Sequence, residues 1–324
     1  MPTASACAGH GPSRGVCADV ERLSIVIPTL GRSGSLAEVL AGLARQRGSL
    51  EGVEVLVVAD QGASTEDVER LVAGERHAAV SIEQAQRPGA SAARNTGWRA
   101  ARAPLVLFLD DDIVPTETLV SEHLSWHASN PRPEVGVLGN VRWSPDVKVT
   151  AFMRWLEMGI QFDYGTIDDV NISWQRFYSC NVSVKRDLLE RTGGFDEQRF
   201  PFGYEDLELA RRMHDRGLRL LYNERAVGEH LKIETLESWR RNMPRIAAAE
   251  RRFTGIYPDQ PAYFYDRFRI AAAAPPSRGR WARLARFVSP DTPWLGRRVW
   301  FSYDLVCSQR LAPDFLTAWE ASEA

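Results

Sequence analysis

The first 110 residues alternate short apolar runs with segments of helical periodicity, and this alternation limits the fold more than any other feature of the sequence. Strands are expected at residues 23–27, 53–58, 78–84 and 104–109, and helices at 33–48, 64–74 and 90–102. The strands are apolar nearly throughout, which is typical of a parallel sheet that helices cover on both faces. Ligands bind such sheets beyond the carboxyl ends of the strands, so functional side chains are expected at that edge.

The rest of the chain is less regular. Strands are expected at residues 134–143, 177–186 and 218–230, and helices at 186–194 and 205–217. Gly139 predicts a bend in the first of these strands. From residue 233 onward the sequence is helical in character, and the run AAAAPPSRGR at 271–280 has the composition of a linker. Together these patterns predict an α/β fold, a mostly parallel sheet flanked by helices, with a helical C-terminal extension.

The composition excludes several classes of protein. A formal charge of −2 gives no overall polybasic signal, so nucleic acid is not an expected partner. The four cysteines are scattered without metal-ligand spacing, which favours a reducing cytoplasm. Residues 1–21 are rich in Gly, Ala, Ser and Pro and are expected to be disordered. No run in the sequence approaches the ~20 apolar residues of a membrane span. A cytoplasmic protein, soluble or peripheral on the inner membrane face, is therefore expected.

Three consecutive carboxylates, Asp110 to Asp112, follow the apolar run of the fourth expected strand. Adjacent carboxylates repel one another, so a protein keeps them together only in open water or where a cation neutralises them. One interpretation is a solvated turn. The other is a site for Mg²⁺ or Mn²⁺ at a rigid strand end, where phosphate oxygens and water complete the coordination shell. This second interpretation implies a phosphorylated substrate.

Polar side chains also follow the first two strands. Thr29 and Arg32 come at the end of the first strand. Asp60 ends the second strand, where it is either a turn residue or a hydrogen-bond acceptor for a base N–H or a ribose hydroxyl. Arg94 lies near the start of the third helix, where unsatisfied backbone N–H groups favour phosphate. Arg94 binds phosphate, forms an ion pair at the surface, or acts as a structural tie that holds parts of the chain together.

A second acidic pair, Glu205 and Asp206, begins the helix expected at residues 205–217. Acids are favoured at a helix N-terminus, but the preceding segment FPFGY is unusually aromatic for a simple cap. A carboxylate held beside aromatic rings at a cleft can act as a general base. His230 ends the last expected strand. A lone histidine is often structural, but a neutral imidazole is also a reasonable ligand for Mn²⁺.

Taken in order, these segments resemble glycosyltransferase family 2, the inverting nucleotide-sugar transferases of GT-A fold. The series runs SIVIPTLGR, VVADQGAST, GASAARNTG, LFLDDD, YSCNVSVKRDLLERTGGFDE and GYEDLELARRM, and it ends at His230. Single motifs are weakly specific, whereas the ordered set is highly specific. The resemblance covers roughly residues 22–232, and the tail from about Ala271 lies outside it.

The resemblance implies a division of the chain into parts. A GT-A domain would occupy residues 22–232, with a nucleotide-binding half at 22–115 and an acceptor-binding half at 116–232. The helical extension would occupy residues 233–324. The segment FDYGTIDDVNISWQ, in the second half, is expected to shape the acceptor site.

The resemblance also implies roles for single residues. The nucleotide-sugar site would contain Pro28, Thr29, Arg32, Asp60, Arg94, Asp110 and Asp111. Mn²⁺ or Mg²⁺ would be held by Asp110, Asp112 and His230. Asp206 would be the catalytic base, with Glu205 beside it as the second catalytic residue. Ala59 departs from the family pattern, because many members carry another acid before the position of Asp60.

The implied function is metal-dependent, inverting transfer of a sugar from a nucleotide-diphosphate sugar, here a UDP-sugar, to a hydroxyl of a glycan, a lipid-linked acceptor or a small molecule. A sugar-nucleotide nucleotidyltransferase is the enzyme alternative, but PTLGR lacks the GxGTR loop that it needs. A non-catalytic protein of the same fold is another, although both acidic motifs are present. The basic and aromatic tail at residues 278–301 either lies on an anionic membrane or packs on the core.

Overall fold

The computed structural model describes residues 22–31, 33–73, 79–161, 163–276 and 279–322, so the segment 1–21 and its predicted disorder lie outside the described residues. The strands are β1 Leu23–Thr29, β2 Val53–Ala59, β3 Ala79–Gln84, β4 Leu105–Leu109, β5 Ile113–Pro115, β6 Val135–Trp143, β7 Asn171–Ile172, β8 Asn181–Lys185 and β9 Arg219–His230. The α-helices are α1 Ser33–Ala44, α2 Thr65–Ala73, α3 Ala90–Ala100, α4 Leu119–Ser129, α5 Ala151–Leu156, α6 Arg186–Thr192, α7 Glu205–His214, α8 Leu236–Ile256, α9 Tyr263–Ala273 and α10 Leu295–Ala321. Short 3-10 helices are η1 Tyr164–Thr166, η2 Trp174–Arg176 and η3 Ala282–Leu284.

The described strands form one nine-stranded sheet in the order β3-β2-β1-β4-β8-β6-β9-β5, and β7 pairs with β9. β1 is parallel to β2 and β4, and β2 is parallel to β3. β8 is antiparallel to both of its neighbours, β4 and β6. β6 and β9 are parallel, while β5 and β7 are antiparallel to β9. The first half is the predicted parallel sheet, and the second half is mixed because β8 reverses direction.

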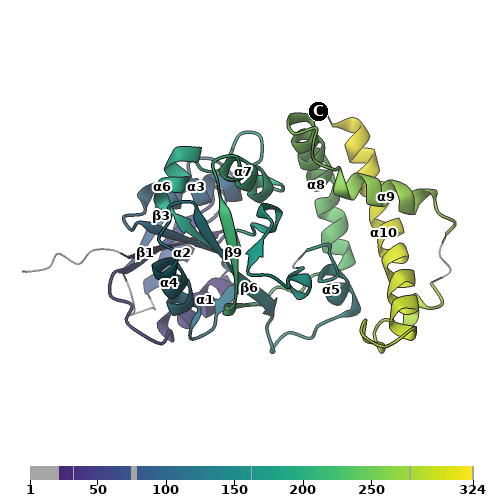
Figure 1. The fold of residues 1–324 in the computed structure, drawn as a ribbon, viewed down its shortest axis with the longest axis horizontal. Coiled ribbons are helices and arrows are strands. Elements are labelled where there is room, and N and C mark those ends of the chain that lie inside the picture. Colours follow the sequence, from purple (N-terminus) through teal and green to yellow (C-terminus); the bar gives the residue numbers. More distant parts are fainter. Residues whose placement is uncertain (1–21, 32, 74–78, 162, 277–278, 323–324) are drawn as a thin grey trace, which may run out of the picture.

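Helices cover both faces of this sheet, as predicted: α3, α6 and α7 lie on one side, and α1 and α4 on the other (Figure 1). β2 is a central strand, and all seven of its residues are buried. Helix α3 lies very close to the sheet at Gly97, where an added Cβ would be 2.3 Å from Val26 Cγ1 and 3.0 Å from Val58 Cγ2. The small residues of α3 therefore allow a close helix–sheet contact that holds its N-terminus at the edge of the sheet.

The bend predicted at Gly139 is confirmed. The pairing of β6 with β9 shifts register between Gly139 and Asn140. A Cβ on Gly139 would lie 2.3 Å from Asn181 Nδ2 and 2.5 Å from the carbonyl oxygen of Ala226. Glycine is required here because two other chain segments occupy the space of a side chain.

Helices α8, α9 and α10 form a layer of their own beside the sheet (Figure 1). Their shared core includes Trp239, Met243, Phe268, Trp300 and Phe315, and it also takes Phe152, Trp155 and Leu156 of α5. The C-terminal helices thus share a core with a helix from the predicted acceptor-binding half, and the domain boundary at residue 232 stays a prediction. None of the described helices is long and apolar enough to cross a membrane.

The linker predicted at residues 271–280 begins inside α9. Residues 271–273 are the last turn of that helix, and Ala271 is buried. Alanine has the highest helix propensity, so a run of four alanines continues the helix until the prolines stop it. The helical character predicted from residue 233 onward is confirmed.

Candidate active site

The carboxyl ends of β1, β2 and β4 meet at one edge of the sheet, and the aspartate triplet lies there. Thr29, the last residue of β1, donates a hydrogen bond from Oγ1 to Asp111 Oδ2 over 2.5 Å. The carbonyl oxygen of Asp112 accepts a hydrogen bond from the backbone N–H of Leu231 over 2.9 Å. The triplet is therefore held between the first strand and the end of β9, which argues against the solvated-turn interpretation.

Asp112 lies beside His230 because β5 pairs with the end of β9, with Ile113 opposite His230. Asp112 Oδ2 is 3.4 Å from His230 Nε2. The imidazole stacks on the indole of Trp143 with 5.0 Å between ring centroids, which fixes the plane of the ring. Burial alone would raise the pKa of Asp112, but the hydrogen bond and charge of His230 lower it below its ordinary value.

Arg94 links the two acidic motifs. Its guanidinium lies 2.9 Å from Asp110 Oδ1 and 3.3 Å from Glu205 Oε1, and the side chain is only 6% exposed. Burial would lower the pKa of Arg94, but the carboxylates of Asp110, Asp206 and Glu205 raise it, so the guanidinium stays charged. Of the three interpretations of this arginine, the structure bears out the structural tie. A contact with the nucleotide stays a prediction.

Glu205 and Asp206 form the first turn of α7, after a sharp turn in which Tyr204 has φ 62. Asp206 Oδ2 accepts a hydrogen bond from the backbone N–H of Ser179 over 2.9 Å. Asp206 Oδ1 is buried and makes no hydrogen bond of normal geometry with the described residues, although the side chain of Ser179 is close enough to lower the pKa of Asp206. Burial and the neighbouring Asp206 raise the pKa of Glu205 to about 7, and burial raises the pKa of Asp206.

Helix α3 fixes the loop that carries this acidic pair. Ser91 Oγ donates to the carbonyl oxygen of Phe200. Asn95 is fully buried and makes two bonds to Phe195, donating to its carbonyl oxygen over 2.8 Å and accepting from its N–H over 2.9 Å. These roles were missed by reasoning from the sequence, because partners about 100 residues away have no local signal.

The predicted turn role of Asp60 has a structural basis. Its carboxylate accepts hydrogen bonds from the N–H of Gly89 over 3.0 and 3.1 Å and from the N–H of Gln61. Gly89 has φ 110, and an added Cβ would lie 2.5 Å from the carbonyl oxygen of Pro201. Asp60 thus orders the start of α3 next to Pro201 in the segment FPFGY. A contact between Asp60 and a base or ribose stays a prediction.

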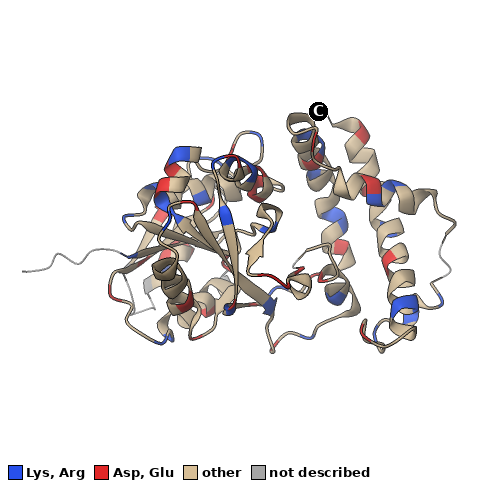
Figure 2. Cartoon of the chain, viewed as in Figure 1, with Lys and Arg blue, Asp and Glu red and all other residues tan. Residues whose placement is uncertain are grey.

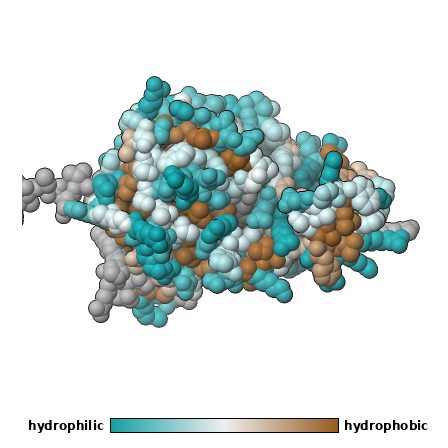
Figure 3. Space-filling view, turned by 60° about the horizontal axis from the view of Figure 1, so that its bottom comes forward, coloured by the Kyte–Doolittle hydropathy of each residue, from teal (hydrophilic) through white to brown (hydrophobic). Residues whose placement is uncertain are grey.

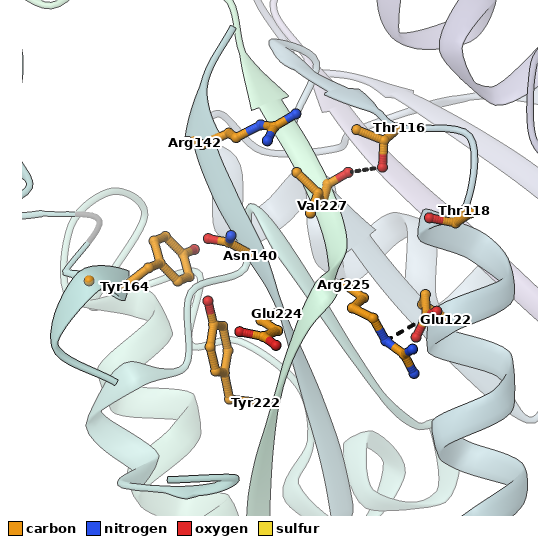
Figure 4. A pocket seen from close by; sticks show the side chains of 11 residues that line it. Thr116, Thr118, Glu122, Asn140, Arg142, Tyr164, Tyr222, Glu224, Arg225 and Val227 are labelled. Carbon is orange, nitrogen blue, oxygen red and sulfur yellow. Dashed lines mark hydrogen bonds and ion pairs between the residues drawn. The ribbon is translucent and has the colours of Figure 1, made fainter. Parts of the chain in front are cut away.

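A polar cavity of 740 Å³ opens within the predicted acceptor-binding half. Tyr164 and Tyr222 lie on one side of it, with 6.2 Å between ring centroids, and the Glu122–Arg225 pair lies on the other (Figure 4). Tyr164 Oη is 3.8 Å from Cys180 Sγ. The N–H of Asp110 in turn donates to the carbonyl oxygen of Cys180, so the cavity wall is connected to the aspartate triplet.

Comparison with known protein families shows which family the chain belongs to. The family model described as Glycosyl transferase family 2 matches residues 24–193, which is more than half of the chain. The chain belongs to glycosyl transferase family 2. A second model, described as the N-terminal domain of galactosyltransferase, matches residues 167–237 and covers the acidic pair and His230. The family resemblance drawn from the ordered motifs is confirmed.

Named relatives are glycosyltransferases. The chain is 30% identical over 246 residues to validoxylamine A glucosyltransferase of Streptomyces hygroscopicus subsp. jinggangensis, covering 66% of this chain and 56% of that protein. It is 29% identical over 227 residues to pre-mycofactocin glycosyltransferase of Mycobacterium tuberculosis, covering 67% of this chain and 44% of that protein. The chain spans about half the length of these curated relatives.

Solved structures confirm the GT-A fold expected for family 2. A mannosyltransferase of Pyrobaculum calidifontis, in complex with GDP-Man and Mn²⁺, has a TM-score of 0.60 at 18% identity, covering 91% of this chain and 87% of that chain. Residues 1–349 of S. aureus TarS, in complex with UDP-GlcNAc, give a TM-score of 0.52 at 15% identity, covering 93% and 91%. These alignments include most of the C-terminal helices.

Ten of the eleven predicted site residues are described, and several are in direct contact. The contacting pairs are Thr29–Asp111, Arg94–Asp110, Arg94–Glu205 and Asp112–His230. Pro28 is half-buried at the end of β1. Arg32 lies outside the described residues, and its role stays a prediction.

The residues present fit a divalent cation. Asp112 and His230 offer a hard carboxylate oxygen and an imidazole nitrogen 3.4 Å apart, a donor set that suits Mn²⁺. Asp110, the third predicted ligand, already binds Arg94. Within the described ranges, no three His, Cys, Asp or Glu side chains are grouped to hold a metal. An ion at this family 2 site would therefore need phosphate oxygens and water to complete its shell.

The raised pKa of Glu205 predicts a pH dependence of stability. Because the folded pKa of about 7 exceeds the ordinary value of 4.5, the folded state holds the proton in this interval. The contribution of Glu205 to the free energy of unfolding is fully present below pH 4.5, and it is lost as pH rises through 7. Relative to wild type, Glu205→Gln should gain on the order of 3 kcal/mol across that interval.

Urea unfolding at several pH values measures this difference. The exposed Glu69→Gln variant is the matched control for loss of one carboxylate. If wild type and Glu205→Gln have the same pH slope between pH 4.5 and 7, Glu205 does not hold a proton in the folded state.

Proposed function

We propose that this family 2 chain is a metal-dependent inverting glycosyltransferase that moves a sugar from a UDP-sugar to an acceptor hydroxyl by single displacement. The observation that carries the proposal is the carboxylate of Asp206. One of its oxygens is fixed by the N–H of Ser179, and the other is buried near the Ser179 hydroxyl but makes no hydrogen bond of normal geometry with the described residues. A buried acceptor atom without a well-formed hydrogen bond costs stability, so its presence at this site favours a functional role.

In this mechanism Asp206 is the general base. Its Oδ1 takes the proton of the acceptor hydroxyl as the hydroxyl oxygen attacks the anomeric carbon. The nucleoside diphosphate leaves from the opposite face, so the configuration at the anomeric carbon inverts. Arg94 holds Glu205 beside the base and Asp110 at the strand end, so the geometry of both motifs depends on one buried guanidinium.

The donor site is proposed at the carboxyl ends of β1, β2 and β4. Pro28, Thr29 and Asp60 would contact the base and ribose, and Arg94, Asp110 and Asp111 would lie toward the phosphates. Arg32 belongs to the same predicted nucleotide-sugar site. Two proteins of similar fold were solved with GDP-Man and UDP-GlcNAc, which supports a nucleotide-diphosphate sugar as donor. A thermal-shift screen of UDP-, GDP- and dTDP-sugars tests the choice of base, because a ligand that binds only the folded state raises its melting temperature.

Mn²⁺ or Mg²⁺ is the proposed cofactor, held by Asp112 and His230, with Asp110 as the third predicted ligand. When bound, the ion would neutralise negative charge on the diphosphate leaving group. A mannosyltransferase of similar fold was solved with Mn²⁺. The carboxylate of Asp112 lies 3.4 Å from the imidazole of His230, and this proximity of two potential ligands supports the assignment.

Asp112→Ala is expected to remove the dependence of UDP binding on Mn²⁺, because it deletes the carboxylate ligand beside His230. Titration calorimetry with UDP, with and without Mn²⁺, measures the effect. The exposed Asp146→Ala variant is the matched control and should bind like wild type. Unchanged Mn²⁺-dependent affinity in Asp112→Ala, with a cooperative unfolding transition, would contradict the metal assignment.

The acceptor is proposed to enter through the polar cavity beside Tyr164 and Tyr222. Aromatic rings with nearby carboxylates, such as Tyr222 next to Glu224, present the apolar faces and hydrogen-bond partners that a sugar ring requires. A glycan, a lipid-linked acceptor or a small molecule with a free hydroxyl would fit this chemistry. The cavity includes Tyr164 and Gly165 from the segment predicted to shape the acceptor site.

A further inference from the structure

A basic-aromatic surface lies apart from the active site, on the C-terminal helical layer. We define it as residues 279–301, from the turn before η3 to the second turn of α10. This segment contains five arginines and one acidic residue, Asp291. Three large aromatic side chains in it are mostly exposed: Phe287 at 73%, Trp294 at 67% and Phe301 at 76%.

These aromatic side chains are held outward by a packed scaffold. Trp300 is 2% exposed and donates from Nε1 to the carbonyl oxygen of Val288 over 2.8 Å. Ala285 and Val299 are also buried in the C-terminal core. Trp294 has φ 56 and ψ −53, a positive φ that a bulky side chain rarely adopts. The chain therefore keeps a strained backbone at a residue whose indole stays in solvent.

The arginines are interleaved with the aromatic rings. The guanidinium of Arg298 lies 4.9 Å from the ring centre of Trp281 and 5.8 Å from that of Trp294. Arg286 lies 4.7 Å from the ring centre of Phe287. Figure 2 shows basic residues at the lower end of α10, and Figure 3 shows a hydrophobic patch on the same C-terminal layer, at the right of the view. The surface thus combines exposed apolar rings with positive charge.

We propose that the basic-aromatic surface docks the protein on an anionic lipid bilayer. Aromatic rings insert at the boundary between headgroups and acyl chains, while arginines keep their charge at the level of anionic phosphates. A second copy of the chain is a poorer partner, because a twofold interface through this surface would bring like charges together. The proposal concerns a face of the C-terminal layer and does not rest on the proposed transferase activity.

Vesicle sedimentation of the full chain tests the proposal. Wild type should bind phosphatidylcholine vesicles that contain phosphatidylglycerol, and bind pure phosphatidylcholine far more weakly. The triple variant Phe287→Ser/Trp294→Ser/Phe301→Ser should lose affinity by about tenfold for each ring removed from the interface. A second variant, Arg283→Gln/Arg286→Gln/Arg297→Gln, should lose about fivefold for each charge near an anionic surface.

Val170→Ser is the matched control, because Val170 is 50% exposed but lies outside the C-terminal layer. It should bind vesicles like wild type, and thermal unfolding should show that every variant is folded. The proposal is overturned if wild type does not sediment with the anionic vesicles, or if the triple serine variant binds as tightly as wild type. It is also overturned if the chain forms a dimer that the serine variant abolishes and vesicles do not bind.

Discussion

Asp206→Asn is expected to lower the rate of sugar transfer by about 10²–10⁴-fold, the usual contribution of a positioned general base. The amide keeps the size of the side chain and can still accept the hydrogen bond from the N–H of Ser179. It lacks the basic lone pair that would take the proton of the acceptor. Affinity for the donor should persist, because the predicted nucleotide contacts lie at the ends of β1, β2 and β4. Steady-state kinetics with titration of the nucleotide separate the two quantities.

Glu205→Gln is the matched comparison for that experiment. Glu205 faces Arg94 and is 9% exposed. Its substitution should therefore weaken the ion pair with Arg94 rather than the transfer of the proton to Asp206. We expect it to reduce transfer less than Asp206→Asn does. Near-normal transfer by Asp206→Asn would remove Asp206 from the mechanism. If Glu205→Gln were instead the inactive variant, the roles of the two neighbours would be exchanged.

Arg94→Met is expected to reduce the free energy of unfolding by about 3–5 kcal/mol, the usual cost of removing one partner from a buried ion pair. Methionine can fill much of the space of the arginine stem, so the loss reports charge rather than volume. The carboxylates of Asp110 and Glu205 would be left without their shared counter-ion. Urea unfolding measures the difference. Faster proteolytic cleavage of the loop that contains Phe195 and Phe200 would report the release of that loop from α3.

Two comparisons make this prediction specific. Arg70→Gln removes an arginine from an exposed pair with Asp67, and such pairs contribute about 0–1 kcal/mol. In Arg94→Met the pKa of Glu205 should rise above its wild-type value, because the charge of Arg94 lowers it, so stability should begin to recover at a higher pH than in wild type as the solution is acidified. If Arg94→Met costs no more than Arg70→Gln at neutral pH, Arg94 is not the tie between the two acidic motifs.

The parallel half of the fold was predictable from the sequence because its signals are local. β1, β2 and β4 are short apolar runs, and β3 is a shorter and more polar segment at the edge of the sheet. Glycine and proline residues between the apolar segments mark the boundaries of these elements. Gly139 marked the bend in β6 in the same way. The edge position of the aspartate triplet followed from sheet topology alone, since parallel strands end at one side.

The remainder depends on contacts between distant residues. Arg94 and Glu205 are 111 residues apart, and nothing near either residue indicates that they form a pair. Asn95 lies near a helix start, and nothing in its local sequence predicts the two hydrogen bonds by which it holds Phe195, 100 residues away. Helix α4 was not predicted, although two histidines on it, His123 and His127, are buried against Ser183 of β8. Tertiary packing, rather than local pattern, decides such positions.

The anomeric configuration of the first product tests the central proposal most directly, and it does not require the acceptor to be known. Proton NMR can follow hydrolysis of an α-linked UDP-sugar in the presence of Mn²⁺, with water as acceptor, at enzyme concentrations that make hydrolysis faster than equilibration of the free sugar. Single displacement assisted by Asp206 predicts that the β-anomer appears first with wild type, and that Asp206→Asn nearly abolishes its formation. First appearance of the α-anomer, or equal rates for wild type and Asp206→Asn, would contradict the account.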